Sequence, residues 1–305
     1  KASVLIDDPV LRAIEECFDI APLHNPPNVK GYRAARDLLR EVPHVAVFDT
    51  AFHQTMEPVA FLYALPYVLY QRHGIRRYGF HGTSHRFVSH RSAEILGRAG
   101  DPGLRVVTCH LGNGCSIAAI RGGRTVDTSM GFTPLEGLVM GSRSGDLDPA
   151  ILLHVMSKEE LGAAELNALL NKHSGLLGIS GLSNDMRKLL EAEAAGNDRA
   201  KLAVDLFCYR LRKYIAAYVG VLGGLDALVF TGGIGENSPV VRQRSVTGLA
   251  AMGIAIDPGR NDAARGLEAD VSPAGAPCRV QVVPTNEELL IARDTYRIVR
   301  GLPLS

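Results

Sequence analysis

The stretch ALVFTGGIGEN, residues 227–237, decides the fold class of this chain. Its first four residues are a short apolar run, typical of a buried strand. Three glycines follow within five residues, and we expect a helix from Glu236 onward. A strand that passes through a Gly-rich turn into a helix is the repeating unit of α/β proteins. The sequence therefore predicts an α/β fold.

The same turn is a candidate anion site. Glycines allow the backbone to approach a phosphate or nucleoside closely, and a helix N-terminus favours negative charge. An ordinary Gly-rich turn fits the pattern about equally well. The chain contains neither a GxGxxG at this place nor a Gly-Lys pair, so both the dinucleotide fingerprint and the P-loop are excluded.

Two further segments resemble this one in design. Residues 77–85, RYGFHGTSH, predict a short strand at 78–80 and then a helix over 84–96, with Ser84 as N-cap and Gly97 as its stop. Residues 105–110 and 116–120 are β-rich, and residues 111–114 join them as a hairpin in which Asn-Gly supplies positive φ. The backbone amides of that turn could hold phosphate oxygens. An ordinary hairpin is the alternative. Together these units predict mixed sheets.

The remaining elements are predicted from hydrophobic periodicity and from the residues that typically begin or end helices and strands. We expect strands at 45–48, 125–127 and 280–283, and helices at 184 onward, 201–222 and 286–300. A helical segment at 61–72 should kink or break at Pro66. The helix at 201–222 places five large residues on one face: Phe207, Leu211, Tyr214, Tyr218 and Leu222.

Single side chains in or near these turns are candidates for chemistry. A metal pair at His81 and His85 is disfavoured, because Gly82-Thr83 separates them and HExxH is absent. His81 is the better candidate for contacting substrate, and His85 for a structural histidine. Arg143 lies in a Gly/Ser loop and is either a solvated residue or a cation for a phosphoryl group.

The carboxylates also have two alternative roles, one structural and one chemical. Asp49 ends a predicted strand and either caps the next helix or serves as base or metal ligand. Glu287 and Glu288 begin the last helix, where the dipole favours them. Asp185 and Arg187 fit a plain helix start.

Composition excludes several classes. The 305 residues are 46% hydrophobic, which is enough for a large core and favours two domains or one large one. A net charge of +1 gives no reason to expect nucleic acid or an anionic membrane as partner. No apolar run approaches the ~18 residues of a membrane span. Five cysteines without CxxC spacing favour cytosolic thiols over disulfides or zinc, so we expect a cytoplasmic protein.

Taken together, these motifs resemble the acetate kinases, the acetokinase family of the superfamily that includes sugar kinases, heat-shock chaperones and actin. The resemblance covers essentially the whole chain; its longest stretches are 47–54 (VFDTAFHQ), 77–85, 127–149 (DTSMGFTPLEGLVMGSRSGDLDP), 230–238 and 284–294. It implies ATP + acetate ⇌ ADP + acetyl phosphate, with Mg²⁺ or Mn²⁺, in a homodimer. It also implies duplicated ribonuclease-H-like, actin-like domains.

The resemblance assigns roles to residues of this chain. Asp49 matches the catalytic carboxylate, and His81 and Arg143 the pair that stabilises the transferring phosphoryl group. Glu287 matches the Mg²⁺ ligand. The nucleotide contacts implied are His110, Leu111, Gly112, Asn113, Gly114, Asp185, Met186, Arg187, Gly233, Ile234, Gly235, Glu236 and Asn237. The walls of the acetate pocket implied are Leu23, Phe80 and Pro134, with His24 beside them.

One departure bears on activity. The family begins with a Gly/Ser-rich phosphate hairpin and has a later Arg that grips acetate, and neither precedes Lys1 in this sequence. We therefore expect a first domain incomplete at its N-terminus, comprising 1–53 plus 289–305, and a second, nucleotide-binding domain at 54–288. The alternatives left open are a propionate or short-chain acyl kinase, and a catalytically impaired nucleotide-binding fragment.

Overall fold

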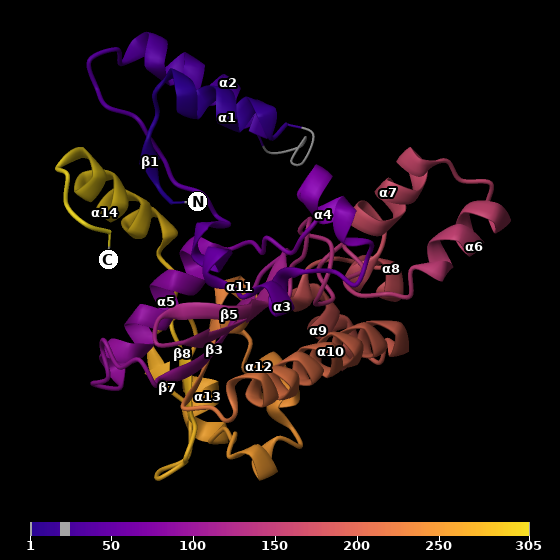
Figure 1. The fold of residues 1–305 in the computed structure, drawn as a ribbon. Helices are drawn as coiled ribbons and strands as arrows, with labels where there is room; N and C mark the ends of the chain where they lie inside the picture. Colours follow the sequence, from indigo (N-terminus) through magenta and orange to yellow (C-terminus); the bar gives the residue numbers. More distant parts are fainter. Residues whose placement is uncertain (1, 19–24, 305) are drawn as a thin grey trace.

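The computed structural model describes residues 2–18 and 25–304 (Figure 1). The strands are β1 Val4–Leu5, β2 Val45–Ala46, β3 Arg105–Leu111, β4 Cys115–Arg121, β5 Arg124–Thr128, β6 Ala227–Thr231, β7 Ala269–Asp270 and β8 Arg279–Val282. The α-helices are α1 Asp8–Glu16, α2 Asn25–Leu38, α3 Pro58–Phe61, α4 Tyr67–His73, α5 Gly82–Ile95, α6 Ala150–Lys158, α7 Ala163–Lys172, α8 Gly175–Ser180, α9 Met186–Ala194, α10 Asp198–Leu222, α11 Gly232–Asn237, α12 Pro239–Val246, α13 Pro258–Ala263 and α14 Glu287–Val299. Two 3₁₀ turns are η1 Ala51–Thr55 and η2 Ala250–Met252.

A six-stranded mixed sheet forms the centre, in the order β5-β4-β3-β6-β8-β7. Strands β3, β6 and β8 are parallel to their neighbours within this trio, and β4, β5 and β7 add antiparallel pairs at the edges. β1 and β2 pair in a separate two-stranded sheet. The α/β prediction with mixed sheets is confirmed, and the domain division at residue 53 stays a prediction.

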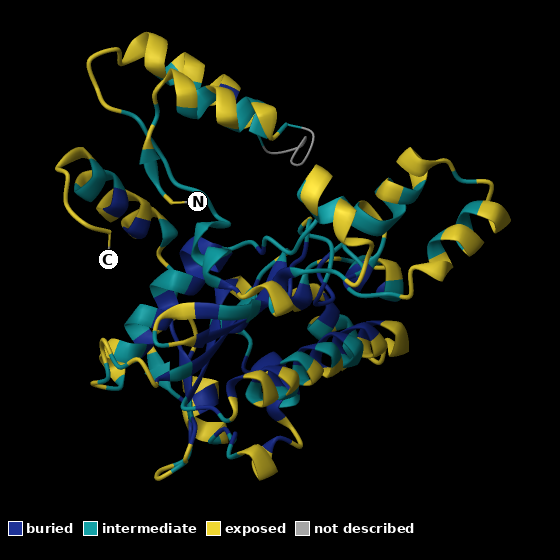
Figure 2. Ribbon diagram, in the orientation of Figure 1, coloured by how far each residue is buried: buried dark blue, intermediate teal, exposed yellow. Residues whose placement is uncertain are grey.

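Side chains alternate between the two faces of the sheet. Val107 of β3 packs in the core that includes Phe207 of α10, whereas Val106 packs in the core that includes Val88 of α5. This is the period of two that a strand imposes. Helices therefore cover both faces, and the dark interior of Figure 2 lies between them. On the α5 side the residues of β3 change from apolar Val106 to polar Thr108 and His110, so this face becomes polar toward the carboxyl end of the strand.

Local signals placed several elements well. α10 begins three residues before the predicted start, because the Asn197 side chain accepts a hydrogen bond from the Ala200 amide as N-cap. Pro66 breaks the predicted helix as expected and stands as N-cap of α4. Asn286 caps α14, and Asp185 caps α9.

Three local predictions are wrong. Residues 78–80 form no strand, since the Tyr78 and Gly79 amides both donate to the Gly131 carbonyl at 3.1 and 3.3 Å and pair with no strand. α5 begins at Gly82, two residues before Ser84, with His81 as N-cap. Residues 112–114 have no positive φ. That turn closes instead through the Gly112 amide and the Gly114 carbonyl, 3.0 Å apart.

The Gly-rich turn after β6 also differs from the prediction, because it is already helical from Gly232 as α11. Among the helices of the described residues, none combines the length and the apolar character needed to cross a membrane.

Candidate active site

Asp49 organises the start of α5. Its Oδ2 accepts a hydrogen bond from the His81 amide at 2.6 Å, and its Oδ1 accepts one from the Thr83 amide at 3.4 Å. Its carbonyl accepts a third from the Gly82 amide at 2.8 Å. A carboxylate that takes the free amides of a helix start is a cap contributed from outside the helix. Asp49 therefore caps α5, which begins 32 residues away, and not the next helix along the chain, η1, whose N-cap Thr50 makes no side-chain cap bond.

His81 has an unusual backbone for its residue type. Its φ is 54°, in the left-handed region that side chains disfavour. Strain of this kind persists where surrounding contacts impose it, and such positions cluster at functional sites. The Asp49 bond to the His81 amide is one such contact.

The His81 ring contacts two polar side chains, Ser116 and His110. Its Nδ1 lies 2.8 Å from Ser116 Oγ, and the ring stacks on His110 with centroids 4.2 Å apart. Burial, then the positive charge of Arg143 and the nearby His53, lowers the pKa of His81 to about 4. The ring is therefore neutral at pH 7 and carries one proton.

Arg143 approaches His81 across Gly114. Its Nη1 donates to the Pro134 carbonyl at 2.7 Å. A Cβ on Gly114 would lie 3.4 Å from Arg143 Nη2 and 3.5 Å from His81 Nε2. The guanidinium and the Nε2 edge of the imidazole thus face the same small space, which the glycine leaves open. Burial lowers the pKa of Arg143, but a guanidinium stays charged at neutral pH.

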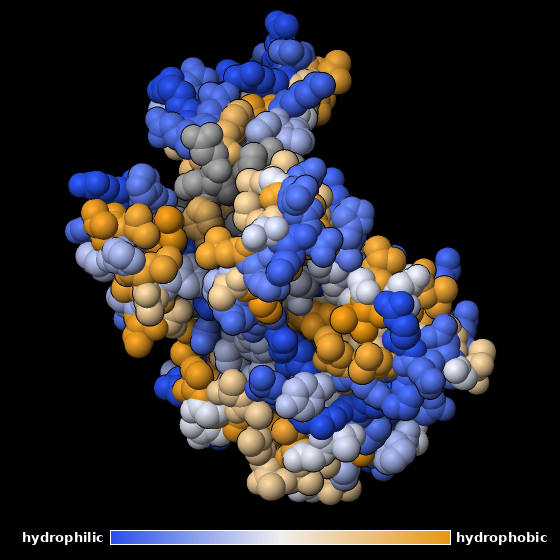
Figure 3. Space-filling model, turned by 90° about the vertical axis from the view of Figure 1, so that its right-hand side faces the viewer, coloured by the Kyte–Doolittle hydropathy of each residue, from blue (hydrophilic) through white to orange (hydrophobic). Residues whose placement is uncertain are grey.

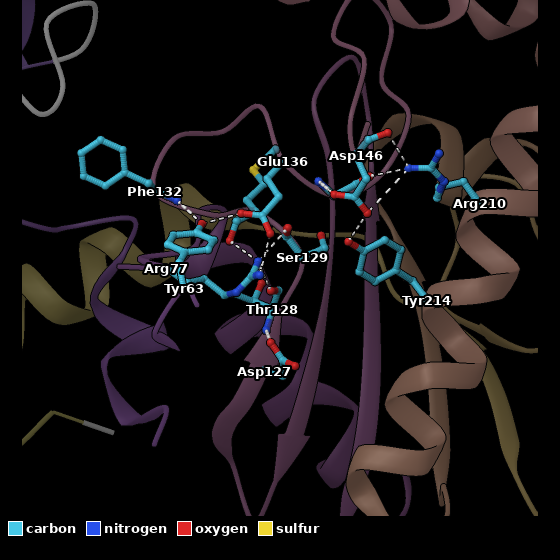
Figure 4. A network of polar contacts seen from close by, with 12 residues as sticks. Tyr63, Arg77, Asp127, Thr128, Ser129, Phe132, Glu136, Asp146, Arg210 and Tyr214 are labelled. Carbon is cyan, nitrogen blue, oxygen red and sulfur yellow. Dashed lines mark hydrogen bonds and ion pairs between the residues drawn. The ribbon is translucent and has the colours of Figure 1, made fainter. Parts of the chain in front are cut away.

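Arg143 lies in a loop at residues 131–146, and contacts with residues far away in the sequence hold this loop (Figure 4). At one end Glu136 pairs with Arg77 at 2.6 Å and accepts from Tyr63 OH. Arg77 also donates to the Thr128 and Ser129 carbonyls at 3.0 and 3.1 Å.

At the other end of the loop, Asp146 Oδ2 accepts from Tyr214 OH at 2.6 Å, and Arg210 donates to the Asp146 carbonyl at 3.1 Å. The Asp146 end is therefore fixed to α10, and the Glu136 end is fixed through Arg77 to the last residue of β5, Thr128.

The hairpin turn at 112–114 contacts both this loop and Asn184, which lies two residues before α9. The Asn113 carbonyl accepts from the Gly141 amide at 2.9 Å, and its Oδ1 accepts from Asn184 Nδ2 at 3.1 Å. A Cβ on Gly141 would lie 2.0 Å from Asn113 Oδ1 and 3.3 Å from the Asn113 carbonyl oxygen, so a larger residue here would have to displace the Asn113 side chain. Leu111, by contrast, is fully buried in the core.

His110 completes the cluster at the end of β3. Its Nδ1 lies 2.8 Å from Ser84 Oγ, which in turn lies 2.8 Å from Thr285 Oγ1. Burial and the neighbouring His81 lower the pKa of His110 to about 3, although Asp49 opposes the shift. This ring is therefore also neutral.

The predicted nucleotide contacts on α9 and α11 divide into exposed and structural groups. Arg187 is largely exposed; its hydrogen bonds to Asp185 lower the pKa of that carboxyl to about 2. Met186 is buried. On α11, Gly233 and Asn237 are exposed, Ile234 is half-buried and Gly235 is buried. Glu236 turns inward, where its Oε1 accepts from the Gly232 and Thr285 amides at 2.9 and 3.1 Å.

Glu287 begins α14 close to Asp49. Burial, and then the negative charge of Asp49, raises the pKa of Glu287. Two carboxylates thus share one region. Within residues 2–18 and 25–304, no group of three or more His, Cys, Asp or Glu side chains is arranged to hold a metal ion.

The predicted acetate pocket is described in part. Phe80 precedes His81, and its carbonyl lies 2.9 Å from His53 Nε2. Pro134 lies against Arg143 through its carbonyl. Leu23 and His24 lie outside the described residues.

Sequence reasoning missed His53, Thr108 and Ser116. His53 and Ser116 are fully buried and hydrogen-bonded, as is His85, whose structural interpretation fits. The available signal was a polar residue inside an apolar strand, as with Thr108 in residues 105–111.

The model of the acetokinase family matches residues 1–293. An acetate kinase of Acetivibrio thermocellus is 53% identical over 99% of this chain and 75% of its own length. The structure of Porphyromonas gingivalis acetate kinase superimposes with a TM-score of 0.94 at 50% identity, over 98% of this chain and 74% of that one. A propionate kinase from Francisella tularensis gives 0.92 at 45% identity, over 99% and 76%. These similarities cover nearly every residue of the chain, including each described loop of the site. The chain belongs to the acetokinase family.

Proposed function

We propose that this chain catalyses the reversible transfer of the ATP γ-phosphoryl group to acetate, giving ADP and acetyl phosphate. The observation that carries the proposal is the convergence of cationic Arg143 and neutral His81 on the space beside Gly114. The match to relatives named acetate kinase supports it.

The chemistry follows from charge. Acetate is ionised at neutral pH and needs no general base. Its attack on a phosphoryl group brings two anions together, so catalysis consists mainly of positioning and charge neutralisation. Arg143 would supply positive charge, and His81 a hydrogen-bond donor, to the transferring oxygens. Asp49 would position His81 through the hydrogen bond that it accepts from the His81 backbone amide.

A divalent cation fits the carboxylate pair. Burial, and then the negative charge of Asp49, raises the pKa of Glu287, and a bound cation would offset both effects by favouring the ionised carboxylate. Mg²⁺ is commonly held by one or two carboxylates together with substrate phosphates, so fewer than three protein ligands suffice. We propose that Glu287 and Asp49 hold Mg²⁺ or Mn²⁺, which would neutralise phosphate charge.

The nucleotide would lie along the turn at 112–114 and the starts of α9 and α11. Of the predicted contacts, Asn113, Arg187, Gly233 and Asn237 have exposed or half-buried side chains or backbone. We expect Leu111, Met186, Gly235 and Glu236 to shape this surface rather than to touch the nucleotide through side chains.

An assay of acetyl phosphate formation from ATP and acetate tests the proposal. Arg143→Ala should lower kcat by about 100- to 1,000-fold, the range for removal of one preorganised transition-state contact. Arg265→Ala, which removes an exposed ion pair with Asp262, is the matched control and should leave kcat unchanged. Equal rates for the two variants would refute the role of Arg143. ATP binding without turnover in the wild-type chain would favour the impaired-fragment alternative.

A propionate or short-chain acyl kinase is the second candidate, favoured by the similarity to a propionate kinase. The ratio of kcat/KM for acetate and propionate decides between them, because one methylene is worth only about 10- to 200-fold. A homodimer is also proposed, and sedimentation of the purified chain would test it.

A further inference from the structure

A chain of three hydrogen bonds leads from the interior of the sheet to the ring of His81. Thr108 Oγ1 lies 2.7 Å from His85 Nδ1, and His85 Nε2 lies 2.7 Å from Ser116 Oγ. The same Ser116 Oγ lies 2.8 Å from His81 Nδ1. Thr108, His85 and Ser116 are fully buried, so water does not compete for these groups.

The number of protons on these groups allows only two directions for this series of hydrogen bonds. Within the described residues, neither ring has a carboxylate as hydrogen-bond partner; His85 is fully buried, and the cation Arg143 lies beside His81, so each ring is neutral and carries one proton. Ser116 has a single hydroxyl proton and lies between two ring nitrogens. It must therefore donate to one ring and accept from the other, and every bond in the chain points the same way.

Thr108 sets the direction. Within the described residues its hydroxyl has no hydrogen-bond partner other than His85 Nδ1. If His85 Nδ1 carried the proton, the Thr108 hydroxyl would be a buried donor without an acceptor, which folded proteins avoid. Thr108 therefore donates to His85 Nδ1, His85 Nε2–H donates to Ser116, and Ser116 donates to His81 Nδ1.

We propose that Thr108, His85 and Ser116 are positioning residues that fix His81 as the tautomer protonated on Nε2. The Nε2 edge faces the space beside Gly114 and Arg143. A protonated Nε2 can donate to an oxygen of the transferring phosphoryl group, whereas the other tautomer would present a lone pair to an anion. The catalytic consequence rests on the proposed function, and the assignment of the tautomer does not.

Ring ¹⁵N chemical shifts of histidine-labelled protein test the tautomer without any assay of activity. The His81 signals are identified by their loss in His81→Gln. In the wild type, His81 Nε2 should resonate as a protonated nitrogen and Nδ1 as an unprotonated one. In Ser116→Ala and in Thr108→Val, His81 should shift toward a mixture of both forms. A wild-type ring protonated on Nδ1, or unchanged His81 shifts in Thr108→Val, would overturn the proposal.

The matched control is Ser92→Ala. Ser92 is also fully buried and donates to a side chain, Gln281, on the far part of α5. It should leave the His81 shifts unchanged. If the protein is catalytically active, Thr108→Val should lower kcat about five- to tenfold, which is the equivalent of one net hydrogen bond. The KM for ATP should stay unchanged. A loss shared equally by Ser92→Ala would indicate a general structural effect and would contradict the positioning role.

Discussion

Two Gly-rich segments of the chain are held in different ways. Residues 232–237 fold into α11, and a carboxylate of the same segment, Glu236, accepts a hydrogen bond from the Gly232 amide. Residues 131–146 form neither helix nor strand. Side chains from distant elements hold that loop, among them Arg77 and Tyr214. Glycine content therefore does not reveal how rigid a loop is; the range of its restraining contacts does.

Acid should destabilise the fold that holds both segments, because its interior contains histidines that are buried in the neutral form. Unfolded histidine has a pKa near 6.5, whereas His53 has about 4 and His110 about 3 in the fold, both mainly through burial. The unfolded chain thus binds more protons below pH 6.5, so stability is full above that pH and is lost as pH falls. We expect a loss of about 4 kcal/mol from these two residues between pH 7 and 5, measured by urea unfolding.

The exposed His154 provides the control for that measurement. His154→Gln should show the same pH dependence as the wild type, and His53→Gln a weaker one. Stability that stays constant from pH 7 to 5 would contradict the assignment of neutral buried histidines.

Gly232→Ala should break the locally held segment. Gly232 has φ +74°, and a Cβ there would lie 2.8 Å from the Leu111 carbonyl oxygen. Left-handed strain and the backbone clash together should cost about 3 kcal/mol of unfolding free energy. Gly233→Ala is the control, because nothing lies within 4 Å of its Cβ; it should be neutral or slightly stabilising. Equal effects in urea unfolding would show that the Gly-rich turn is not constrained at Gly232.

Glu136→Gln should loosen the remotely held loop. The change removes the charge that pairs with Arg77 and should cost about 2 kcal/mol. It should also lower kcat, because the Pro134 carbonyl that anchors Arg143 is two residues away. Glu236→Gln keeps an oxygen acceptor for two amides and should cost under about 1 kcal/mol. The reverse order of stabilities would contradict the comparison.

Tyr214→Phe should have the smallest effect. It removes one hydrogen bond to Asp146 at the far end of the loop and should cost about 1 kcal/mol. Tyr209→Phe, on the same helix but 59% exposed, should change the midpoint of thermal unfolding within error. A loss as large in Tyr209→Phe would mean that the Asp146 contact contributes nothing.

Local patterns predicted most of the fold. The helix at 201–222, the break at Pro66 and the Asn286 cap depend on periodicity, proline sterics and capping, which act within a few residues. The prediction of a strand at 78–80 was wrong because the Tyr78 and Gly79 amides donate hydrogen bonds to a carbonyl more than 50 residues away. No pattern within residues 77–85 could supply that partner.

The candidate site shows the same division. The Gly-rich turns and the lone charged residues Asp49, Arg143 and Glu287 stood out in the sequence. Ser116 and Thr108 did not, because their importance depends on which ring nitrogens they meet in the folded chain. The capping of α5 by Asp49 likewise depends on two segments that only the fold brings together.

The sequence by itself determined the α/β class, the order of the main elements and the residue types available to the site. These follow from local energies: apolar periodicity, the fixed φ of proline and the freedom of glycine. The tertiary structure alone decided the left-handed backbone of His81, the anchoring of Arg143 on Pro134 and the direction of the chain from Thr108 to His81. The physical reason is that a buried polar group must find a hydrogen-bond partner, and that partner is set by packing rather than by position in the sequence.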